Sequence, residues 1–242
     1  MALLKRIPTD YGTISITRSA HDGSMAYYQN GCFHSQATRQ GISICAYVHV
    51  IHELIRQARA RRILIIGCAG GTLATMLRRL HCHVTVVDIN PMAFVIARRY
   101  FRLPEAVRCV RRDGIGYLRL TRKTYDAVVI DVFGSDNTVP RPFTTDAFFR
   151  RVGAVLSSSG LIIMNVITAD DTDKRADTIA RQAESTGMPI TLFDWPRHKD
   201  RNTVIVGGDI RRAAIPSGHE PAWMRADFKG LVRRKPRRLG GA

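Results

Sequence analysis

Long apolar runs and paired cysteines are both missing from this sequence of 242 residues. No apolar run approaches the roughly 20 residues needed to span a bilayer, and the apolar segment after Met1 is too short for a secretory signal. The 5 cysteines are odd in number and widely spaced, without a Cys-x-x-Cys pair. This pattern argues against a disulfide framework and indicates reduced thiols. We therefore expect a cytoplasmic protein that makes no membrane contact.

Acidic residues are also few, since 20 Asp and Glu stand against 37 Lys and Arg, which gives a net charge of +17. Such an excess attracts polyanions, including nucleic acid. However, the arginines are spread in pairs over predicted helices, and the basic cluster at 229–238 has no interleaved aromatic residues on which bases could stack. We interpret the charge mainly as solvated helix faces, with nucleic-acid binding as the less favoured alternative.

A glycine-rich segment, Gly67-Cys-Ala-Gly-Gly71, follows an apolar β-branched run and precedes a helical pattern. The next apolar run ends in Asp88, 21 positions after Gly67. In such a strand–loop–helix–strand unit the glycines let the backbone approach a nucleoside, and the carboxylate accepts hydrogen bonds from the ribose hydroxyls. A dinucleotide is disfavoured because Ala69 and Thr72 occupy the second and third glycine positions of Gly-x-Gly-x-x-Gly.

A second acidic residue, Asp113, ends the following predicted strand and precedes Gly114. A carboxylate at this place can accept a hydrogen bond from an adenine amino group, in a pocket shared with Asp88. A glycine loop, a ribose acid and an adenine acid on successive strands indicate a site of the S-adenosylmethionine type. The candidate nucleoside-binding residues are Gly67, Ala69, Gly70, Gly71, Asp88, Ile89, Asp113 and Gly114.

The chain is predicted to be an α/β protein with three segments. Residues 1–41 contain the short strands and turns of a small N-terminal β-hairpin domain. Residues 42–225 begin with a helix and then alternate strand and helix patterns, which predicts a methyltransferase-like (Rossmann-like) sheet with helices on both faces. Residues 226–242 are basic and aperiodic, and we expect a flexible tail. Seven strands are expected in the sheet, at 63–67, 83–88, 106–111, 127–132, 160–166, 189–194 and 202–207, the last two as an antiparallel pair at one edge.

Asp131 ends the fourth predicted strand of this sheet, in the segment Tyr125-Asp-Ala-Val-Val-Ile-Asp131. Ligands of open α/β sheets bind outside the carboxyl ends of the strands, so Asp131 should face the same crevice as Asp88 and Asp113. A partly desolvated carboxylate there can act as a general base toward an amine, or orient the amine. The alternative is a structural carboxylate that caps a loop, and we favour the functional role.

Together these segments resemble the spermidine synthase (polyamine aminopropyltransferase) family, over residues 12–207. The resemblance is carried by Ile66-Gly-Cys-Ala-Gly-Gly-Thr-Leu73, Val86-Val-Asp-Ile-Asn-Pro91, Arg112-Asp-Gly114, Tyr125-Asp-Ala-Val-Val-Ile-Asp131, Thr145-Asp-Ala-Phe-Phe149 and Ser159-Gly-Leu-Ile-Ile-Met-Asn165. Upstream, Tyr28-Gln-Asn-Gly-Cys-Phe-His-Ser-Gln36 resembles a strand-and-glycine segment of the family that ends in a substrate-contacting Gln.

The resemblance implies a methyltransferase-like fold, usually dimeric, and a reaction on decarboxylated S-adenosylmethionine. The aminopropyl group of this donor would pass to a polyamine nitrogen. By position, Asp88 would hold the ribose, Asp113 the adenine, and Asp131 would deprotonate the amine. The residues implied to contact the amine substrate are Gln36, Tyr47 and Asp136. We therefore predict a homodimeric transferase that needs no metal.

Three departures from the family pattern leave other functions open. The glycine loop has no acidic residue, Val132-Phe-Gly134 replaces the family's residues after the catalytic acid, and Tyr47 is followed by Val48 in place of Glu. Each change removes negative charge from a pocket for cationic amines, and each such contact is worth about 1.5–3 kcal/mol. One alternative is a methyltransferase that uses S-adenosylmethionine itself. Another is a catalytically diverged nucleoside-binding protein with a basic surface for nucleic acid.

Overall fold

The N-terminal part of the chain forms a small antiparallel sheet. Its strands are β1 (Ala2–Ile7), β2 (Ile14–Arg18), β3 (Met25–Gln29) and β4 (Cys32–Ala37), in that spatial order. Asn30 and Gly31 form the two-residue turn between β3 and β4, and both have positive φ angles of 52° and 81°. This is the backbone that a tight hairpin turn requires, which explains why the sequence places Asn-Gly there.

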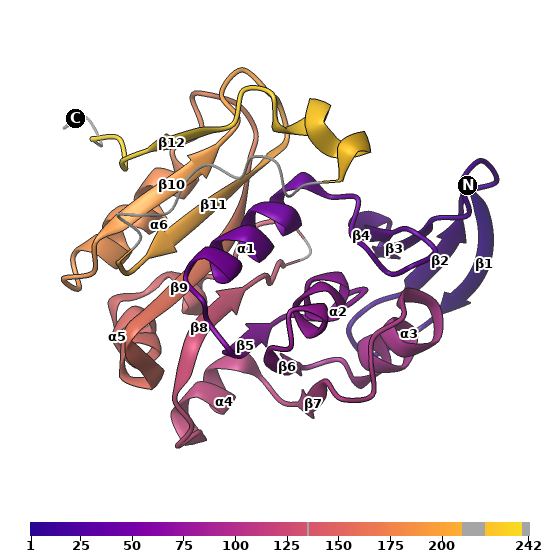
Figure 1. Cartoon of the computed structure of the whole chain (residues 1–242), viewed down its shortest axis with the longest axis horizontal. Coiled ribbons are helices and arrows are strands. Elements are labelled where there is room, and N and C mark those ends of the chain that lie inside the picture. Colours follow the sequence, from indigo (N-terminus) through magenta and orange to yellow (C-terminus); the bar gives the residue numbers. More distant parts are fainter. Residues whose placement is uncertain (135, 210–220, 239–242) are drawn as a thin grey trace.

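The rest of the chain forms an α/β body with one large sheet (Figure 1). The computed structural model describes residues 1–134, 136–209 and 221–238. The strands of the body are β5 (Arg62–Ile66), β6 (His83–Asp88), β7 (Arg108–Arg111), β8 (Tyr125–Ile130), β9 (Leu156–Thr168), β10 (Ile190–Asp194), β11 (Arg201–Gly207) and β12 (Val232–Arg234). Their order is β12-β10-β11-β9-β8-β5-β6-β7. Strands β5 to β9 pair in parallel, whereas β10, β11 and β12 add antiparallel pairs.

Helices cover both faces of the large sheet, as the alternating pattern predicts (Figure 1). They are α1 (Ala46–Gln57), α2 (Thr72–Arg79), α3 (Pro91–Phe101), α4 (Gly114–Leu120), α5 (Asp146–Val155) and α6 (Arg175–Glu184), with the short 3-10 helices η1 (Arg141–Thr144) and η2 (Ala222–Phe228). Because side chains alternate along β5, Ile63 and Ile65 pack with α1 to α3, while Leu64 and Ile66 pack with α4 to α6. The structure confirms the predicted α/β architecture. Among the described residues, no helix has the length and apolar content needed to cross a membrane.

The small sheet is fixed to the α/β body through α3. Ile14, Ile16 and Tyr27 from the small sheet form a buried cluster with Ile96 and Phe101 of that helix. In Figure 1 the small sheet lies at one end of the molecule beside α3, and β12 lies near the opposite end. The packing holds the small sheet over the region where the β6 strand passes into α3, and this region contains the site described below.

The C-terminal segment differs from the predicted flexible tail. Val232–Arg234 pair with β10 and form an eighth strand, outside the predicted antiparallel pair of β10 and β11. The cause is electrostatic, because Arg234 donates hydrogen bonds to Asp194 (2.9 Å) and to Asp177 (2.6 Å), which are both buried. A basic segment thus becomes ordered by two carboxylates that lie far away in the sequence. The prediction of a seven-stranded sheet followed by a free tail was wrong for residues 232–234, while residues 239–242 lie outside the described residues.

Candidate active site

The loop between β5 and α2 passes very close to the carboxyl end of β8. Gly67 has φ +98°, and a Cβ atom on it would lie 2.1 Å from the carbonyl oxygen of Asp131. Only glycine fits this approach. Ala69 also has a positive φ of 42°, while Gly70 packs against Phe101 and Gly71 begins α2. The glycine loop, which follows β5, is therefore in direct contact with the end of the neighbouring strand β8.

Asp88, at the carboxyl end of β6, holds this loop in place. Its Oδ2 atom accepts a hydrogen bond from the backbone N–H of Cys68 (2.8 Å), and its Oδ1 atom accepts one from the N–H of Asn90 (2.8 Å). Burial raises the pKa of the Asp88 carboxyl, and these hydrogen bonds oppose the rise. A carboxylate can accept about four hydrogen bonds, so Asp88 keeps acceptor capacity for the hydroxyls of a ligand.

A cleft of about 280 Å³ opens at these strand ends, and we call it the nucleoside cleft. The predicted residues that line it are Gly67, Ala69, Asp88, Ile89, Asp113, Gly114 and Asp131. Ile89 is 46% exposed and offers an apolar surface to a base. Asp113 also caps α4, since its Oδ2 atom accepts a hydrogen bond from the N–H of Gly116 (2.6 Å). Gly70 and Gly71 do not line this cleft, and they act on it through the shape of the loop.

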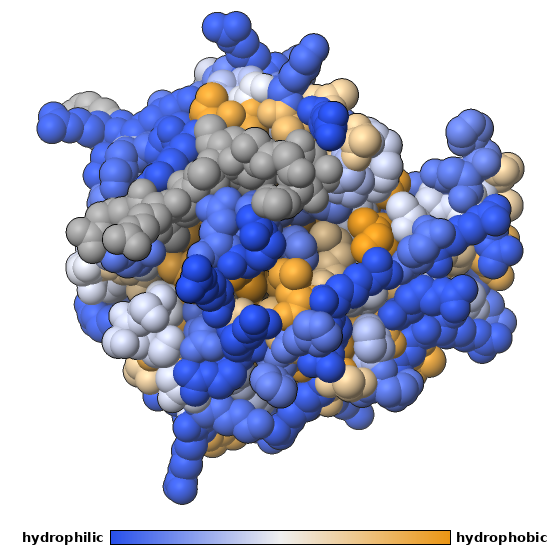
Figure 2. All heavy atoms as spheres, in the orientation of Figure 1, coloured by the Kyte–Doolittle hydropathy of each residue, from blue (hydrophilic) through white to orange (hydrophobic). Residues whose placement is uncertain are grey.

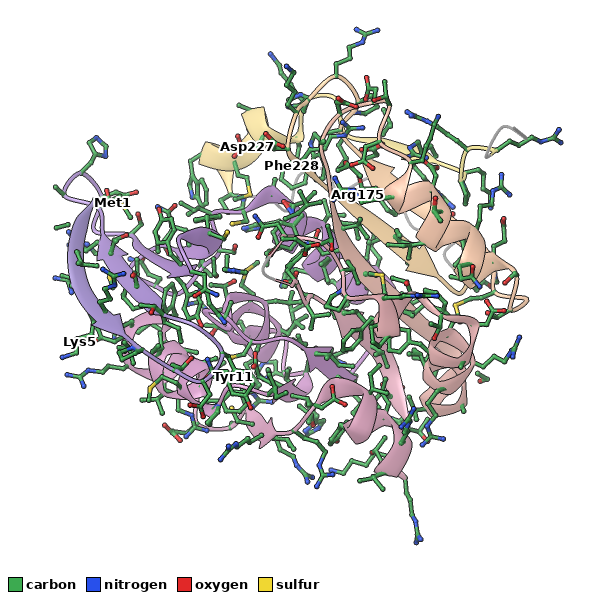
Figure 3. All side chains as sticks on the ribbon, turned by 180° about the vertical axis from the view of Figure 1, so that it is seen from behind. Met1, Lys5, Tyr11, Arg175, Asp227 and Phe228 are labelled. Atoms are coloured by element: carbon green, nitrogen blue, oxygen red, sulfur yellow. The ribbon has the colours of Figure 1, made fainter. Side chains whose placement is uncertain are left out.

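The small sheet and the loop after β1 form another wall of the nucleoside cleft. Tyr11, Tyr27, Gln29 and His34 line this wall. The Tyr27 hydroxyl donates to Oε1 of Gln29 (3.2 Å), and Nε2 of Gln29 donates to the carbonyl oxygen of Tyr11 (2.7 Å). In Figure 3 Tyr11 lies in the loop after β1, beside the α/β body. This polar wall had no signal in the sequence, because it depends on how the two sheets pack.

Asp131 follows the last residue of β8 and lies where two clefts meet. It lines the nucleoside cleft and also a second cleft of about 480 Å³, which we call the acceptor cleft. Burial raises the pKa of the Asp131 carboxyl, and hydrogen bonds from Asn165 and Tyr47 oppose the rise. A carboxylate with a raised pKa is a better proton acceptor than an exposed one, and it remains ionised at neutral pH where enough hydrogen bonds support it.

Two donors fix the orientation of the Asp131 side chain. The Tyr47 hydroxyl on α1 donates to Oδ2 (3.1 Å), and Nδ2 of Asn165 on β9 donates to Oδ1 (3.0 Å). Asn202 on β11 in turn donates to Oδ1 of Asn165 (3.2 Å). Burial and the nearby Asp131 carboxylate raise the pKa of Tyr47 well above its ordinary value, so its hydroxyl stays protonated. Tyr47 therefore lies beside the predicted base, and Asn165 is a partner that the sequence did not reveal.

Gln36 lies away from both clefts, in contrast to the expectation that it contacts substrate. Its Nε2 atom donates to the Ser24 hydroxyl (2.8 Å) on the neighbouring part of the small sheet. His34, two residues earlier, lines both clefts instead. The pairing of β3 with β4 shifts between Tyr27–Ser35 and Tyr28–Phe33, so His34 is the extra residue of a β-bulge. Bulges redirect side chains, and a sequence pattern does not reveal them. Burial lowers the pKa of His34, which favours its neutral form.

The acceptor cleft is acidic. Asp131, Asp136 and Asp200 line it together with one guanidinium, that of Arg175. Asp136 accepts hydrogen bonds from the hydroxyl and the N–H of Thr138, which lower the pKa of its carboxyl. Asp200 precedes β11, 69 positions after Asp131 in the sequence, and nothing in the sequence links the two. The cleft thus has carboxylates for a cationic amine, although the glycine loop has none. In the part of the chain that the structure describes, no group of three His, Cys, Asp or Glu side chains could hold a metal ion.

The sequence of this chain was compared with models of known protein families. Residues 45–184 match the family model of the spermine/spermidine synthase domain. The chain belongs to this family. The resemblance predicted from the sequence motifs is therefore confirmed.

A curated relative is similar in sequence to about half of this chain. The polyamine aminopropyltransferase of Chromobacterium violaceum is 35% identical over 115 residues, which are 46% of this chain and 44% of that protein. The chain spans about half the length of the curated relatives it matches.

Solved structures show the same fold at low sequence identity. A probable spermidine synthase from Corynebacterium glutamicum has a TM-score of 0.76 at 17% identity, with 98% of this chain and 91% of that chain covered. Human methyltransferase-like protein 13, in complex with SAH, has a TM-score of 0.59 at 17% identity, with 76% of this chain and 99% of that chain covered. The α/β body of this spermine/spermidine synthase family member is thus methyltransferase-like.

Proposed function

We propose that this chain is a transferase that moves the aminopropyl group of decarboxylated S-adenosylmethionine to an amine. The observation that carries the proposal is the position of Asp131, whose carboxylate lines both the nucleoside cleft and the acceptor cleft. A base at that junction can take a proton from an amine in one cleft while a sulfonium donor occupies the other. Family membership supports the same reaction class.

The nucleoside cleft supplies the groups that an adenosyl donor needs. Asp88 would accept hydrogen bonds from the ribose hydroxyls, Ile89 would lie against the adenine ring, and Asp113 would accept from the adenine amino group. Gly67 lets the loop approach the backbone of Asp131 closely, which shapes the wall of the nucleoside cleft. The negative charges of Asp88, Asp113 and Asp131 favour a cationic sulfonium over a neutral nucleoside.

The acceptor cleft supplies the base. Asp131 is held by Tyr47 and Asn165, so its position does not depend on the substrate. It would accept the proton that the attacking nitrogen loses, and positioned bases of this kind contribute about 10²–10⁴-fold to rate. Asp136 and Asp200 would attract the amine before reaction.

Methyl transfer from S-adenosylmethionine is the second candidate, and one observation favours it. Ala69 lines the nucleoside cleft at the tip of the glycine loop, where an acidic residue would repel the carboxylate of a methionine moiety. An alanine does not repel that carboxylate.

The two candidates are separated by the mass of the product. The protein is incubated with an amine and either decarboxylated or ordinary S-adenosylmethionine, and the amine products and nucleoside by-products are identified by mass spectrometry. Aminopropyl transfer predicts an aminopropylated amine and methylthioadenosine, formed only with the decarboxylated donor. A methylated product and S-adenosylhomocysteine would establish methyl transfer and refute the proposal.

A further inference from the structure

A third hollow adjoins the acceptor cleft, and we call it the outer groove. It has a volume of about 770 Å³ and lies between η1, the end of β9 and the start of α6. Asp136, Ile167 and Arg175 line both the acceptor cleft and the outer groove, so the two hollows adjoin each other. Arg175, which is labelled in Figure 3, is the first residue of α6 and lines both hollows. A molecule bound at Asp131 that extends past Asp136 would enter the outer groove.

The charge of the outer groove is opposite to that of the acceptor cleft. Its cations are Arg141, Lys174 and Arg175, against the carboxylates of Asp136 and Asp173. The acceptor cleft has one cation and three carboxylates. The sign of the local charge therefore changes along the path from Asp131 to the outer groove.

Two of the cations in the outer groove have no acidic partner among the described residues. Arg175 is paired with Asp173, at 2.7 Å between Nη2 and Oδ2. Arg141 and Lys174 are exposed, and neither makes an ion pair with any residue in the described ranges 1–134, 136–209 and 221–238. Two unpaired cations beside a groove are suited to an anionic group such as a carboxylate or a phosphate.

Apolar side chains also line the outer groove. Val139, Ile167 and Ile179 are each half-buried and line the outer groove between its polar residues. Such a surface packs against methylene groups and offers no partner to a charge. The hollow beside Asp131 is thus acidic, and the adjoining outer groove combines apolar side chains with an excess of cations.

From this order of charges we propose that the preferred acceptor is an alkylamine with an anionic group at its far end. The inference rests on the proposed aminopropyl transfer and names the acceptor class for that reaction. The acceptor nitrogen forms a bond to the propyl carbon, the carbon–sulfur bond breaks with its electron pair going to sulfur, and methylthioadenosine leaves. Asp131 takes the proton that the nitrogen loses. Arg141 and Lys174 hold the carboxylate or phosphate at the other end.

A simple diamine fits this path less well. If the diamine is long enough to reach the outer groove, its second ammonium group would lie near Arg141 and Lys174, and like charges in one groove repel each other. Replacing that ammonium by a carboxylate changes repulsion into attraction without altering the reacting end. The inference therefore concerns only the charge at the end of the acceptor that does not react.

The test compares diamines, aminoalkanoates and aminoalkyl phosphates of matched chain lengths, with decarboxylated S-adenosylmethionine as donor and methylthioadenosine as the readout. The wild-type protein should show a higher kcat/KM for an anionic acceptor than for the matched diamine. In the double variant Arg141→Gln, Lys174→Gln, the KM for the anionic acceptor should rise at least about tenfold, a change of about 1.4 kcal/mol. The carboxylate and phosphate series show which anion is preferred.

The control is the double variant Arg122→Gln, Lys123→Gln, which removes the same charge from exposed positions between α4 and β8. It should leave the KM for anionic acceptors unchanged. A higher kcat/KM for diamines, insensitive to Arg141 and Lys174, would overturn this inference while leaving aminopropyl transfer standing. If no amine of any class yields methylthioadenosine although the protein binds that nucleoside, the proposed function itself is refuted.

Discussion

At the scale of single residues, the environment of Asp131 combines two opposed effects. Burial raises the pKa of its carboxyl, and the hydrogen bonds from Asn165 and Tyr47 pull that pKa down again. The first effect makes the group a stronger base, and the second favours its ionised form and fixes its direction. Loss of either partner should therefore change the pH at which the group works.

Tyr47→Phe tests this balance. Without the hydroxyl the charged form of Asp131 loses one donor, so its pKa rises and the acidic limb of the kcat/KM profile moves to higher pH. A hydrogen bond to a charged group is worth about 1.5–3 kcal/mol, which corresponds to a shift of about one pH unit or more. The measurement is the pH dependence of kcat/KM. Tyr28→Phe is the control, since the Tyr28 ring makes an edge-to-face contact with Phe33 and lines neither cleft. A limb that does not move in Tyr47→Phe would contradict this account.

The site residues that the sequence predicted lie at the ends of parallel strands, whereas the residues that it missed depend on a β-bulge or on strand pairing. Asp88, Asp113 and Asp131 were predicted to converge because each ends a parallel strand, and such ends share one edge of the sheet. His34 was missed because a β-bulge, and no sequence pattern, directs it into the clefts. Asp200 and Asn165 were missed because their relation to Asp131 depends on the pairing of β8, β9 and β11. The roles of all these residues in binding and catalysis stay predictions.

At the scale of elements, the glycine loop depends on a close approach of two backbones. Gly67→Ala should destabilise the protein more than Gly187→Ala, although both positions have positive φ angles, 98° and 87°. A left-handed conformation costs a non-glycine residue about 1–2 kcal/mol at either position. Only at Gly67 would the new Cβ meet a backbone atom, at 2.1 Å, whereas Gly187 has no atom within 4 Å.

Chemical denaturation of both variants gives the free energies of unfolding. The difference between them isolates the contact with the Asp131 carbonyl from the backbone conformation. Gly67→Ala should also weaken the binding of methylthioadenosine, because the loop lines the nucleoside cleft. Equal losses of stability in the two variants would show that the close approach is unimportant.

The ordered C-terminal strand shows why an element can be hidden from sequence reasoning. Val232–Arg234 is a short basic segment without a strand pattern, and its pairing is decided by Asp177 and Asp194. The longer strands of the large sheet were predictable because apolar runs between turns encode them locally. The small sheet is an intermediate case, because its short strands and the Asn30–Gly31 turn have a local signal, while the sequence does not give the order and pairing of its four strands.

Arg234→Gln should therefore be among the most destabilising substitutions of a charged residue in this chain. It leaves two buried carboxylates without their shared guanidinium, and breaking a buried ion pair costs about 3–5 kcal/mol. Arg150→Gln is the matched control, because Arg150 pairs with Asp146 on the surface at 3.5 Å. Such exposed pairs are worth about 0–1 kcal/mol. Urea denaturation of the two variants measures both values, and similar losses would contradict the role assigned to β12.

At the scale of the whole molecule, a carboxylate that links distant segments through hydrogen bonds makes the stability depend on pH, and Asp126 is such a group. Asp126 links the starts of β5 and β8 by accepting from the N–H groups of Arg61 and Arg62 and from the Arg62 guanidinium. Partial burial would raise the pKa of Asp126, but the hydrogen bonds outweigh it and lower the pKa from 3.8 to about 2. A lowered pKa means that the folded state prefers the charged form.

The resulting stability is fully present above the unfolded pKa of 3.8 and is lost as the pH falls toward 2. Asp126→Asn should therefore be less stable than the wild type at neutral pH, and the two should converge as the pH falls from about 4 to about 2. The measurement is the free energy of unfolding by urea at a series of pH values. A difference that stays constant over this range would show that ionisation of Asp126 does not matter.

The net charge of +17 is distributed unevenly over the molecule. Figure 2 shows that hydrophilic residues cover most of one face, with hydrophobic residues gathered in smaller areas near its middle. The clefts around Asp131 are acidic by contrast, and only the outer groove among the three hollows has an excess of cations. Net charge therefore says little about the ligand, because the local charge at each hollow decides what binds. The homodimer implied by family resemblance stays a prediction.

The central claim is that the carboxylate of Asp131 acts as the base between two clefts, and Asp131→Asn tests it most directly. An amide of the same shape can still bond to Asn165 and Tyr47, so we predict normal folding and an unchanged Kd for methylthioadenosine by calorimetry. The rate of aminopropyl transfer should fall at least about a hundredfold. A variant that transfers the group at nearly the wild-type rate would contradict the claim.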